Sequence, residues 1–123
     1  MAALRAGAAG EAVAIAHLEA SGLRVIVRDL RYRLGHLDAV CEEAGVLVAV
    51  EVKARRGGGL GLPQEAVDRR KQATLRILLD VFRLTSGRGD QPCRIDVVAV
   101  HLDRDLRPLR CEYIRDVVWG RGS

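Results

Sequence analysis

Aromatic side chains are scarce in this sequence. Tyr32, Phe82, Tyr113 and Trp119 are the only four, about 3% of 123 residues. Proteins that bind single-stranded nucleic acid stack bases on such side chains, so a base-stacking surface has little support here. Contact with nucleic acid is better explained by arginine side chains that bind the phosphate backbone.

Cysteines and long apolar runs are also lacking. Cys41, Cys93 and Cys111 are odd in number and far apart, which excludes a paired disulfide framework and a zinc-ligand spacing. No uncharged stretch approaches the roughly 20 residues of a membrane span. Arg5 and Glu11 interrupt the first segment, so a secretory signal is not expected. We therefore expect a cytoplasmic protein with reduced cysteines and no membrane partner.

Charged residues are plentiful, at 29% against 49% hydrophobic, which is typical of globular proteins. The formal net charge of +4 and the pI of about 9.4 permit a polyanionic partner without requiring one. The length suits one domain. We expect a single domain over residues 1–123, with a flexible Gly-rich loop at 55–63 and a C-terminal tail at 115–123.

The spacing of apolar residues predicts seven elements in the order α-β-β-β-α-β-β. Helices are expected over 5–21, where Gly22 ends the helix, and over 64–84, where the apolar spacing is amphipathic. Short β-branched or alternating segments predict strands over 23–30, 35–42, 46–54, 94–102 and 109–114. The sequence therefore predicts an α/β fold, a five-stranded mixed sheet flanked by helices.

The second and third predicted strands form a hairpin around Ala44-Gly45, in which the numbers of facing residues sum to 89. Asp38 then lies opposite Glu51, with β-carbons about 4.5 to 5.5 Å apart, and His36 lies opposite Lys53. Alternation puts these four side chains on one face of the hairpin. The other face is apolar and is expected to be core: Leu37, Ala39, Cys41, Val48, Val50 and Val52.

Two neighbouring carboxylates repel each other, and burial increases the repulsion, so such a pair usually has a compensating cation. Mg²⁺, or Mn²⁺, prefers oxygen ligands and commonly takes one or two protein carboxylates. Asp38 and Glu51 match this requirement, and Lys53 can orient an attacking water. The pattern indicates phosphodiester hydrolysis. The alternative is a metal-free scaffold whose ion pairs only fix strand register, since Glu-x-Lys alone is a weak motif.

These residues resemble known patterns. Asp38 followed by Glu51-Val52-Lys53 resembles the signature of the PD-(D/E)XK nuclease superfamily. Further segments, from about residue 7 to 114, resemble the YraN-like family of uncharacterised bacterial proteins, whose most similar characterised relatives are archaeal Holliday-junction resolvases. The segments that carry this resemblance are Gly10-Glu11 with Ala14, Arg28-Asp29-Leu30-Arg31, Gly35-His36-Leu37-Asp38, Val50-Glu51-Val52-Lys53-Ala54-Arg55, Ala66-Val67-Asp68 with Lys71, and Arg94-Ile95-Asp96-Val97.

The resemblance implies a restriction-endonuclease-like fold with a Mg²⁺ site at Asp38 and Glu51 and with Lys53 as the catalytic lysine. It also implies that Glu11 is a further metal ligand or a carboxylate that orients water; the alternative is an exposed helix residue. The family usually has Gly-Glu-(Ile/Leu)-Asp where this chain has His36 before Leu37-Asp38. An imidazole there would weaken metal binding, transfer a proton, or play a structural or water-bridged role.

Basic residues near this cluster are expected to contact phosphates, which sets affinity without reading sequence. They are Arg55, Arg56, Arg69, Arg70 and Lys71. Each alone is more often just a solvated charge. Arg94 and Asp96 share a strand face, so they could pair with each other or with the site; the preferred interpretation is an ion pair at the edge of the core.

The leading hypothesis is a metal-dependent endonuclease that acts on DNA, including branched or otherwise structured DNA. The rival is a nucleic-acid-binding module that keeps the nuclease fold and has weak or no catalytic activity, an interpretation motivated by His36. A homodimer would supply two sites for paired cuts, although the sequence names no interface.

Overall fold

The helices and strands follow the predicted order in a computed structural model, which describes residues 2–56 and 67–117. They are α1 (Ala2–Ala20), β1 (Arg24–Arg31), β2 (His36–Glu43), β3 (Val46–Arg56), α2 (Arg69–Thr85), β4 (Cys93–Leu102) and β5 (Pro108–Ile114). Most of the predicted loop at 55–63 and of the tail at 115–123 lies outside the described residues. Neither of these two helices is long and apolar enough to cross a membrane.

The second helix starts later than predicted, and its cap explains why. The Asp68 side chain accepts a hydrogen bond from the backbone amide of Lys71 at 2.8 Å. An N-terminal cap of this kind satisfies one of the free amides of the first turn, so α2 begins at Arg69. The predicted residues 64–66 lie outside the described part of the chain.

The five strands form one mixed sheet in the order β1-β2-β3-β4-β5. All neighbours are antiparallel except β3 and β4, which are parallel. Parallel neighbours need a long crossover, and α2 lies in the connection between them. The predicted α/β class and the predicted element order are both confirmed.

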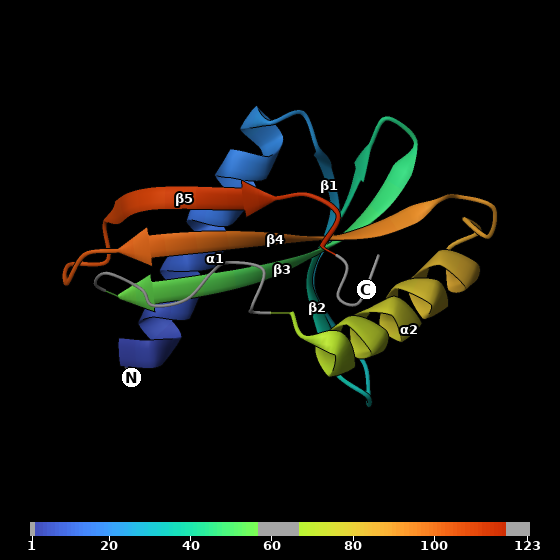
Figure 1. Ribbon diagram of the computed structural model, residues 1–123, viewed down its shortest axis with the longest axis horizontal. Helices are drawn as coiled ribbons and strands as arrows, with labels where there is room; N and C mark the ends of the chain where they lie inside the picture. The colour runs from blue at the N-terminus through green and yellow to red at the C-terminus, as the bar shows by residue number, and fades with distance from the viewer. Residues whose placement is uncertain (1, 57–66, 118–123) are drawn as a thin grey trace.

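The two helices cover opposite faces of the sheet (Figure 1). The face toward α1 carries Ala39, Cys41, Val48 and Val50, whereas the face toward α2 carries Val40, Leu47 and Ala49. Helix α1 lies close to β3 because Gly10 has no side chain; a Cβ there would overlap the Cβ of Ala54. Buried apolar layers on both faces thus hold β3 in the centre of the molecule.

The hairpin has the predicted register near its turn. Ala44 and Gly45 both have positive φ, 50° and 82°, as a two-residue turn between twisted antiparallel strands requires. Five pairs follow, from Glu43 with Val46 to Ala39 with Val50, and their numbers sum to 89 as predicted. The ladder ends there, because β2 turns away from β3 and continues beside β1 alone (Figure 1).

This separation corrects one prediction. Leu37 was expected on the face of Ala39 and Cys41, but it packs in the cluster under α2. Beyond Ala39 the strand pairs only with β1, where Leu37 is registered with Leu30. The alternation of faces within the hairpin therefore does not extend to the end of β2.

Candidate active site

The two predicted carboxylates lie at the fork where β2 leaves β3. Asp38 is the first residue of β2 beyond the β2–β3 ladder, and Glu51 is the corresponding residue of β3. One oxygen of Asp38, Oδ2, accepts a hydrogen bond from the backbone amide of Val52 at 2.8 Å. The side chain thus takes the place of a strand partner, which keeps the Asp38 carboxylate between the two strands.

Glu51 is buried, with 8% of its surface exposed. Burial, the charge of Asp38 and a hydrogen bond with the Asp38 carboxyl raise the pKa of Glu51 to about 7, against the opposing effect of Lys71. Desolvation and like charge both disfavour the ionised form. The pair therefore needs a shared proton or more positive charge than the neighbouring side chains supply.

Lys71 provides part of that charge. Its Nζ lies 3.0 Å from Oε2 of Glu51 and comes from the first turns of α2. Sequence reasoning assigned Lys71 to phosphate contacts and missed this ion pair, which joins residues 20 positions apart on different elements. The only signal was the occurrence of Lys71 together with Asp68 in the YraN-like pattern, and Asp68 caps the turn that carries Lys71.

His36 contacts the other carboxylate. Its Nε2 lies 2.9 Å from Oδ1 of Asp38. The prediction that it faces Lys53 fails, because the β2–β3 register stops at Ala39 and Val50 before reaching those residues. Both Asp38 oxygens therefore already have a protein partner, the imidazole on one and the Val52 amide on the other.

Lys53 follows Glu51 by two residues, so alternation places both on the face of the sheet turned away from α1. Its side chain is exposed, and no ion pair to it occurs within residues 2–56 and 67–117.

Glu11 comes from α1, which packs against the opposite face. In the described part of the chain, no three His, Cys, Asp or Glu side chains form a metal-binding group. A ligand role for Glu11 stays a prediction.

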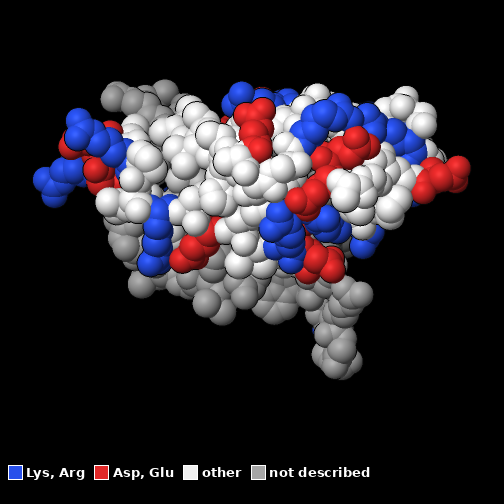
Figure 2. All heavy atoms as spheres, turned by 90° about the horizontal axis from the view of Figure 1, so that it is seen from above, with Lys and Arg blue, Asp and Glu red and all other residues white. Residues whose placement is uncertain are grey.

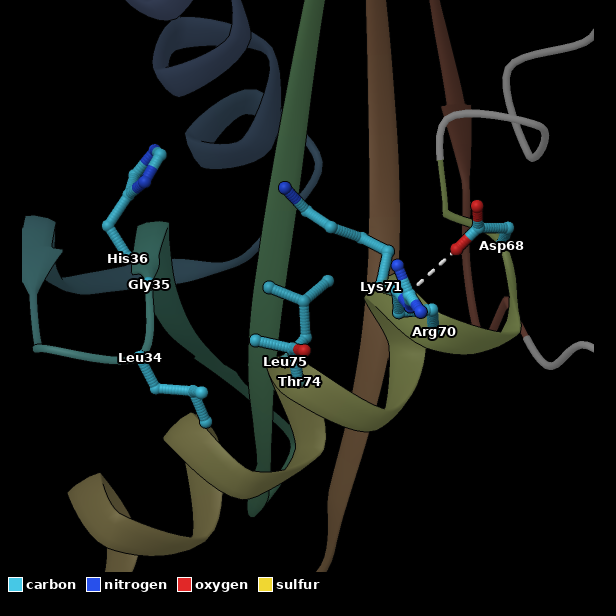
Figure 3. Close-up of a pocket in the computed structure, with 8 residues that line it drawn as sticks. All are labelled: Leu34, Gly35, His36, Asp68, Arg70, Lys71, Thr74 and Leu75. Atoms are coloured by element: carbon cyan, nitrogen blue, oxygen red, sulfur yellow. Dashed lines mark hydrogen bonds between the residues drawn. The ribbon is translucent and has the colours of Figure 1, made fainter.

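A pocket of about 360 Å³ is lined by His36 and Lys71, the side chains that contact Asp38 and Glu51. It lies between the β1–β2 turn and the first half of α2, and its lining comprises Leu34, Gly35, His36, Asp68, Arg70, Lys71, Thr74 and Leu75. Figure 3 shows the Lys71 side chain extending from α2 toward β3, with His36 across the opening. The two side chains that touch the acidic pair thus also line a solvent-open space.

The other basic candidates are divided between two places. Arg69 and Arg70 are exposed at the start of α2, and Arg70 lines the pocket. Arg55 and Arg56 lie at the end of β3, where Arg56 donates a hydrogen bond to the carbonyl oxygen of Arg104 at 2.6 Å. Positive and negative side chains alternate on the face shown in Figure 2, so that face presents no uniform basic surface.

A second group of charges lies on the opposite face of the sheet, the face that α1 covers. Asp96, fully buried, accepts hydrogen bonds from Arg94, from the Tyr113 hydroxyl at 2.6 Å and from the Asp116 amide at 2.8 Å. Arg94 also contacts Glu43. The predicted Arg94–Asp96 pair is confirmed. Because Asp96 is fully buried and three different residues donate hydrogen bonds to it, we interpret this group as structural.

Known proteins resemble most of the chain. The sequence profile described as "Uncharacterised protein family UPF0102" matches residues 10–100. Three UPF0102 proteins are similar to this chain over most of its length. Those of Symbiobacterium thermophilum, Pelotomaculum thermopropionicum and Rhodococcus jostii are 46%, 41% and 40% identical to this chain. These matches cover 91%, 89% and 92% of this chain and 94%, 92% and 95% of the relatives. The profile match includes all the residues placed at the fork.

Proposed function

The chain belongs to UPF0102, the YraN-like family within the restriction-endonuclease-like superfamily, and from that membership we propose that it is a metal-dependent endonuclease that hydrolyses phosphodiester bonds of DNA. The observation that carries the proposal is the buried Glu51 beside Asp38 at the fork of β2 and β3. Branched or otherwise structured DNA is the proposed substrate class, by analogy with the resolvases that the family resembles.

The residues at the fork suit a divalent cation. Two carboxylates face one ammonium, and burial makes the second negative charge costly. Their oxygen atoms are the ligands that Mg²⁺ and Mn²⁺ prefer. When bound, such an ion would neutralise charge on the phosphate and lower the pKa of a coordinated water. We assign Asp38 and Glu51 as its protein ligands.

The remaining roles follow from position. The Val52 amide orients the Asp38 carboxylate, so the ligand is held before any cation arrives. Lys53, exposed beside Glu51, is proposed to orient the attacking water and to stabilise the charge that develops on the phosphate. Arg55, Arg56, Arg69 and Arg70 are proposed to hold flanking phosphates.

Two measurements on the same protein test this function. Calorimetric titration of Mg²⁺ and Mn²⁺ should show binding to the wild type that Glu51→Gln removes. Linear duplex, single-stranded and four-way-junction DNA should be cut only with metal present, and Lys53→Ala should abolish the cutting without abolishing metal binding. Absence of metal-dependent heat in the wild type would instead support a metal-free scaffold, with Glu51 paired only to Lys71.

One observation favours a second candidate, a nucleic-acid-binding module with weak or no turnover. His36 lies on Asp38 where the family pattern usually has an acid, so the cation site has one carboxylate fewer. DNA that is bound with the same affinity by wild type and Lys53→Ala, and cut by neither in Mg²⁺ or Mn²⁺, would establish this alternative.

A further inference from the structure

The chain has only two lysines among its 20 basic residues, and the described structure gives them different surroundings. Lys71 contacts Glu51, with 3.0 Å between Nζ and Oε2, whereas Lys53 has no acidic partner in residues 2–56 and 67–117. A lysine ammonium is a compact point charge, while an arginine guanidinium binds a carboxylate through two parallel hydrogen bonds. The residue that contacts the buried acid is thus the basic type that forms the less fixed contact.

The Lys71 ammonium contacts the carboxylate that most needs a positive charge beside it, the buried Glu51. Glu51 is buried next to Asp38, and Lys71 is its only basic partner within the described residues. The ammonium contacts Oε2 of Glu51, so a divalent ion on the same carboxylate would compete with it for that oxygen atom or for the same electrostatic role. A bound divalent ion would neutralise Glu51 and so remove the reason for the Lys71 ammonium to stay there.

We propose that Lys71 is a displaceable counter-ion: it neutralises Glu51 while the site is free of metal, and it is released when a divalent ion binds. The released ammonium then contacts a phosphate of DNA in the adjoining pocket. This inference rests on the proposed function, and it assigns Lys71 a role distinct from that of Lys53. Lys71 is a positioning residue in this scheme, since it acts through Glu51 and through the bound phosphate.

The surroundings of Lys71 allow this movement. Its side chain is 39% exposed, so the ammonium can leave Glu51 without opening the core. The contact with Asp68 holds only the backbone amide of Lys71 and leaves the side chain free. Lys71 also lines the pocket beside Arg70, so the released charge joins a second basic side chain in a space of about 360 Å³ (Figure 3).

Competition predicts that loss of the ammonium strengthens metal binding. Mg²⁺ should bind Lys71→Met about tenfold more tightly than the wild type in calorimetric titration without DNA, because the ion no longer displaces a partner. Arg76→Met is the matched control. It removes one positive charge from an exposed position of the same helix and should change the affinity less than about twofold.

The variant should also depend on metal for its stability. In EDTA, Lys71→Met should unfold at a lower temperature than the wild type, because Glu51 and Asp38 lose their counter-charge. Saturating Mg²⁺ should raise its midpoint more than it raises that of the wild type. On a Lys53→Ala background, which suppresses cleavage, Lys71→Met should bind duplex DNA several-fold more weakly at saturating Mg²⁺.

A measurement on the wild type does not depend on the variant folding. Because there are only two lysines, labelling lysine with ¹³C and ¹⁵N gives two side-chain signals, which Lys53→Ala assigns. Addition of Mg²⁺ should move the Lys71 ammonium signal to the position of an unpaired lysine. If the wild type binds Mg²⁺ through Glu51 while the Lys71 signal stays unchanged, or if Lys71→Met binds Mg²⁺ no more tightly, the counter-ion role is wrong and the proposed function survives. If neither protein binds metal, both are wrong.

Discussion

The Asp38 carboxylate accepts a hydrogen bond from the backbone amide of Val52 at 2.8 Å. In a regular hairpin that amide would pair with the backbone of β2, but the ladder has ended at Ala39 and Val50. The side chain therefore has two functions at once. It closes the gap where the strands separate, and it brings an acid to Glu51.

Substitution of Asp38 should separate these two functions. Asp38→Ala leaves the Val52 amide without its acceptor at a half-buried position and should lower the free energy of unfolding by about 1–3 kcal/mol. Asp38→Asn keeps an acceptor oxygen and should lose less stability while still losing Mg²⁺ affinity. Urea unfolding and calorimetry on both variants check this. Equal stability of the two would show that the contact with Val52 contributes nothing.

The hairpin register was predictable because it depends on local chemistry. Ala44 and Gly45 can adopt the positive φ that a tight turn requires, and alternation then fixes which residues face each other. The same arithmetic fails for His36 and Leu37, because the separation of β2 from β3 depends on tertiary packing under α2. The sequence thus predicted that Asp38 and Glu51 meet, but not the fork that holds them.

Side-chain contacts could be predicted where both partners lie on one element, but not where they lie on different elements. Arg94 and Asp96 are two positions apart on one strand, so strand geometry alone predicts their pair. Lys71 and Glu51 lie on a helix and a strand, and their contact depends on where α2 crosses the sheet. No periodicity within a single sequence fixes that crossing. The sequence therefore predicted Lys71 as a phosphate contact near the site and not as a partner of Glu51.

Gly10 sets the distance between α1 and β3. Gly10→Ala should destabilise the fold by about 1–3 kcal/mol, since the new methyl group overlaps Ala54 and the helix must move. Gly7→Ala is the matched control on the same helix. Nothing lies within 4 Å of a Cβ at Gly7, so the higher helix propensity of alanine should leave stability unchanged or raise it by up to about 1 kcal/mol. Thermal and urea unfolding compare the two. A loss of similar size in both would argue against close packing at Gly10.

Glu43 should make stability depend on acid pH. Hydrogen bonds from Arg115 and Arg94 lower the pKa of Glu43 from 4.5 to about 2. A carboxyl whose pKa is lower in the folded than in the unfolded protein stabilises the fold at pH values above its unfolded pKa. This contribution is lost as pH falls from 4.5 toward 2. The wild type should therefore be more stable than Glu43→Gln at pH 6, and the difference should shrink across that window. Urea midpoints at several pH values measure it; a difference independent of pH would contradict the prediction.

The Asp96 group should affect stability and not metal binding. Tyr113→Phe removes the hydroxyl that donates to a fully buried carboxylate at 2.6 Å, which should cost about 1–3 kcal/mol. Tyr32→Phe is the control, since the Tyr32 hydroxyl has no hydrogen bond within the described part of the chain and its loss should cost little. Neither variant should change Mg²⁺ affinity in calorimetry. A weaker Mg²⁺ affinity in Tyr113→Phe would place the second acidic group in the functional site.

His36 is the position where the chain departs from the pattern of its family, and its contact with Asp38 gives that departure a measurable consequence. His36→Glu adds a third carboxylate beside Asp38, so it should raise Mg²⁺ affinity, by about tenfold. The same change adds repulsion, and we expect a lower unfolding temperature than the wild type in EDTA. His36→Gln is the control: it is neutral and should show neither effect to the same degree. If His36→Glu binds Mg²⁺ no better than His36→Gln, the cation is not held at Asp38, and the assignment of Asp38 as a metal ligand fails with it.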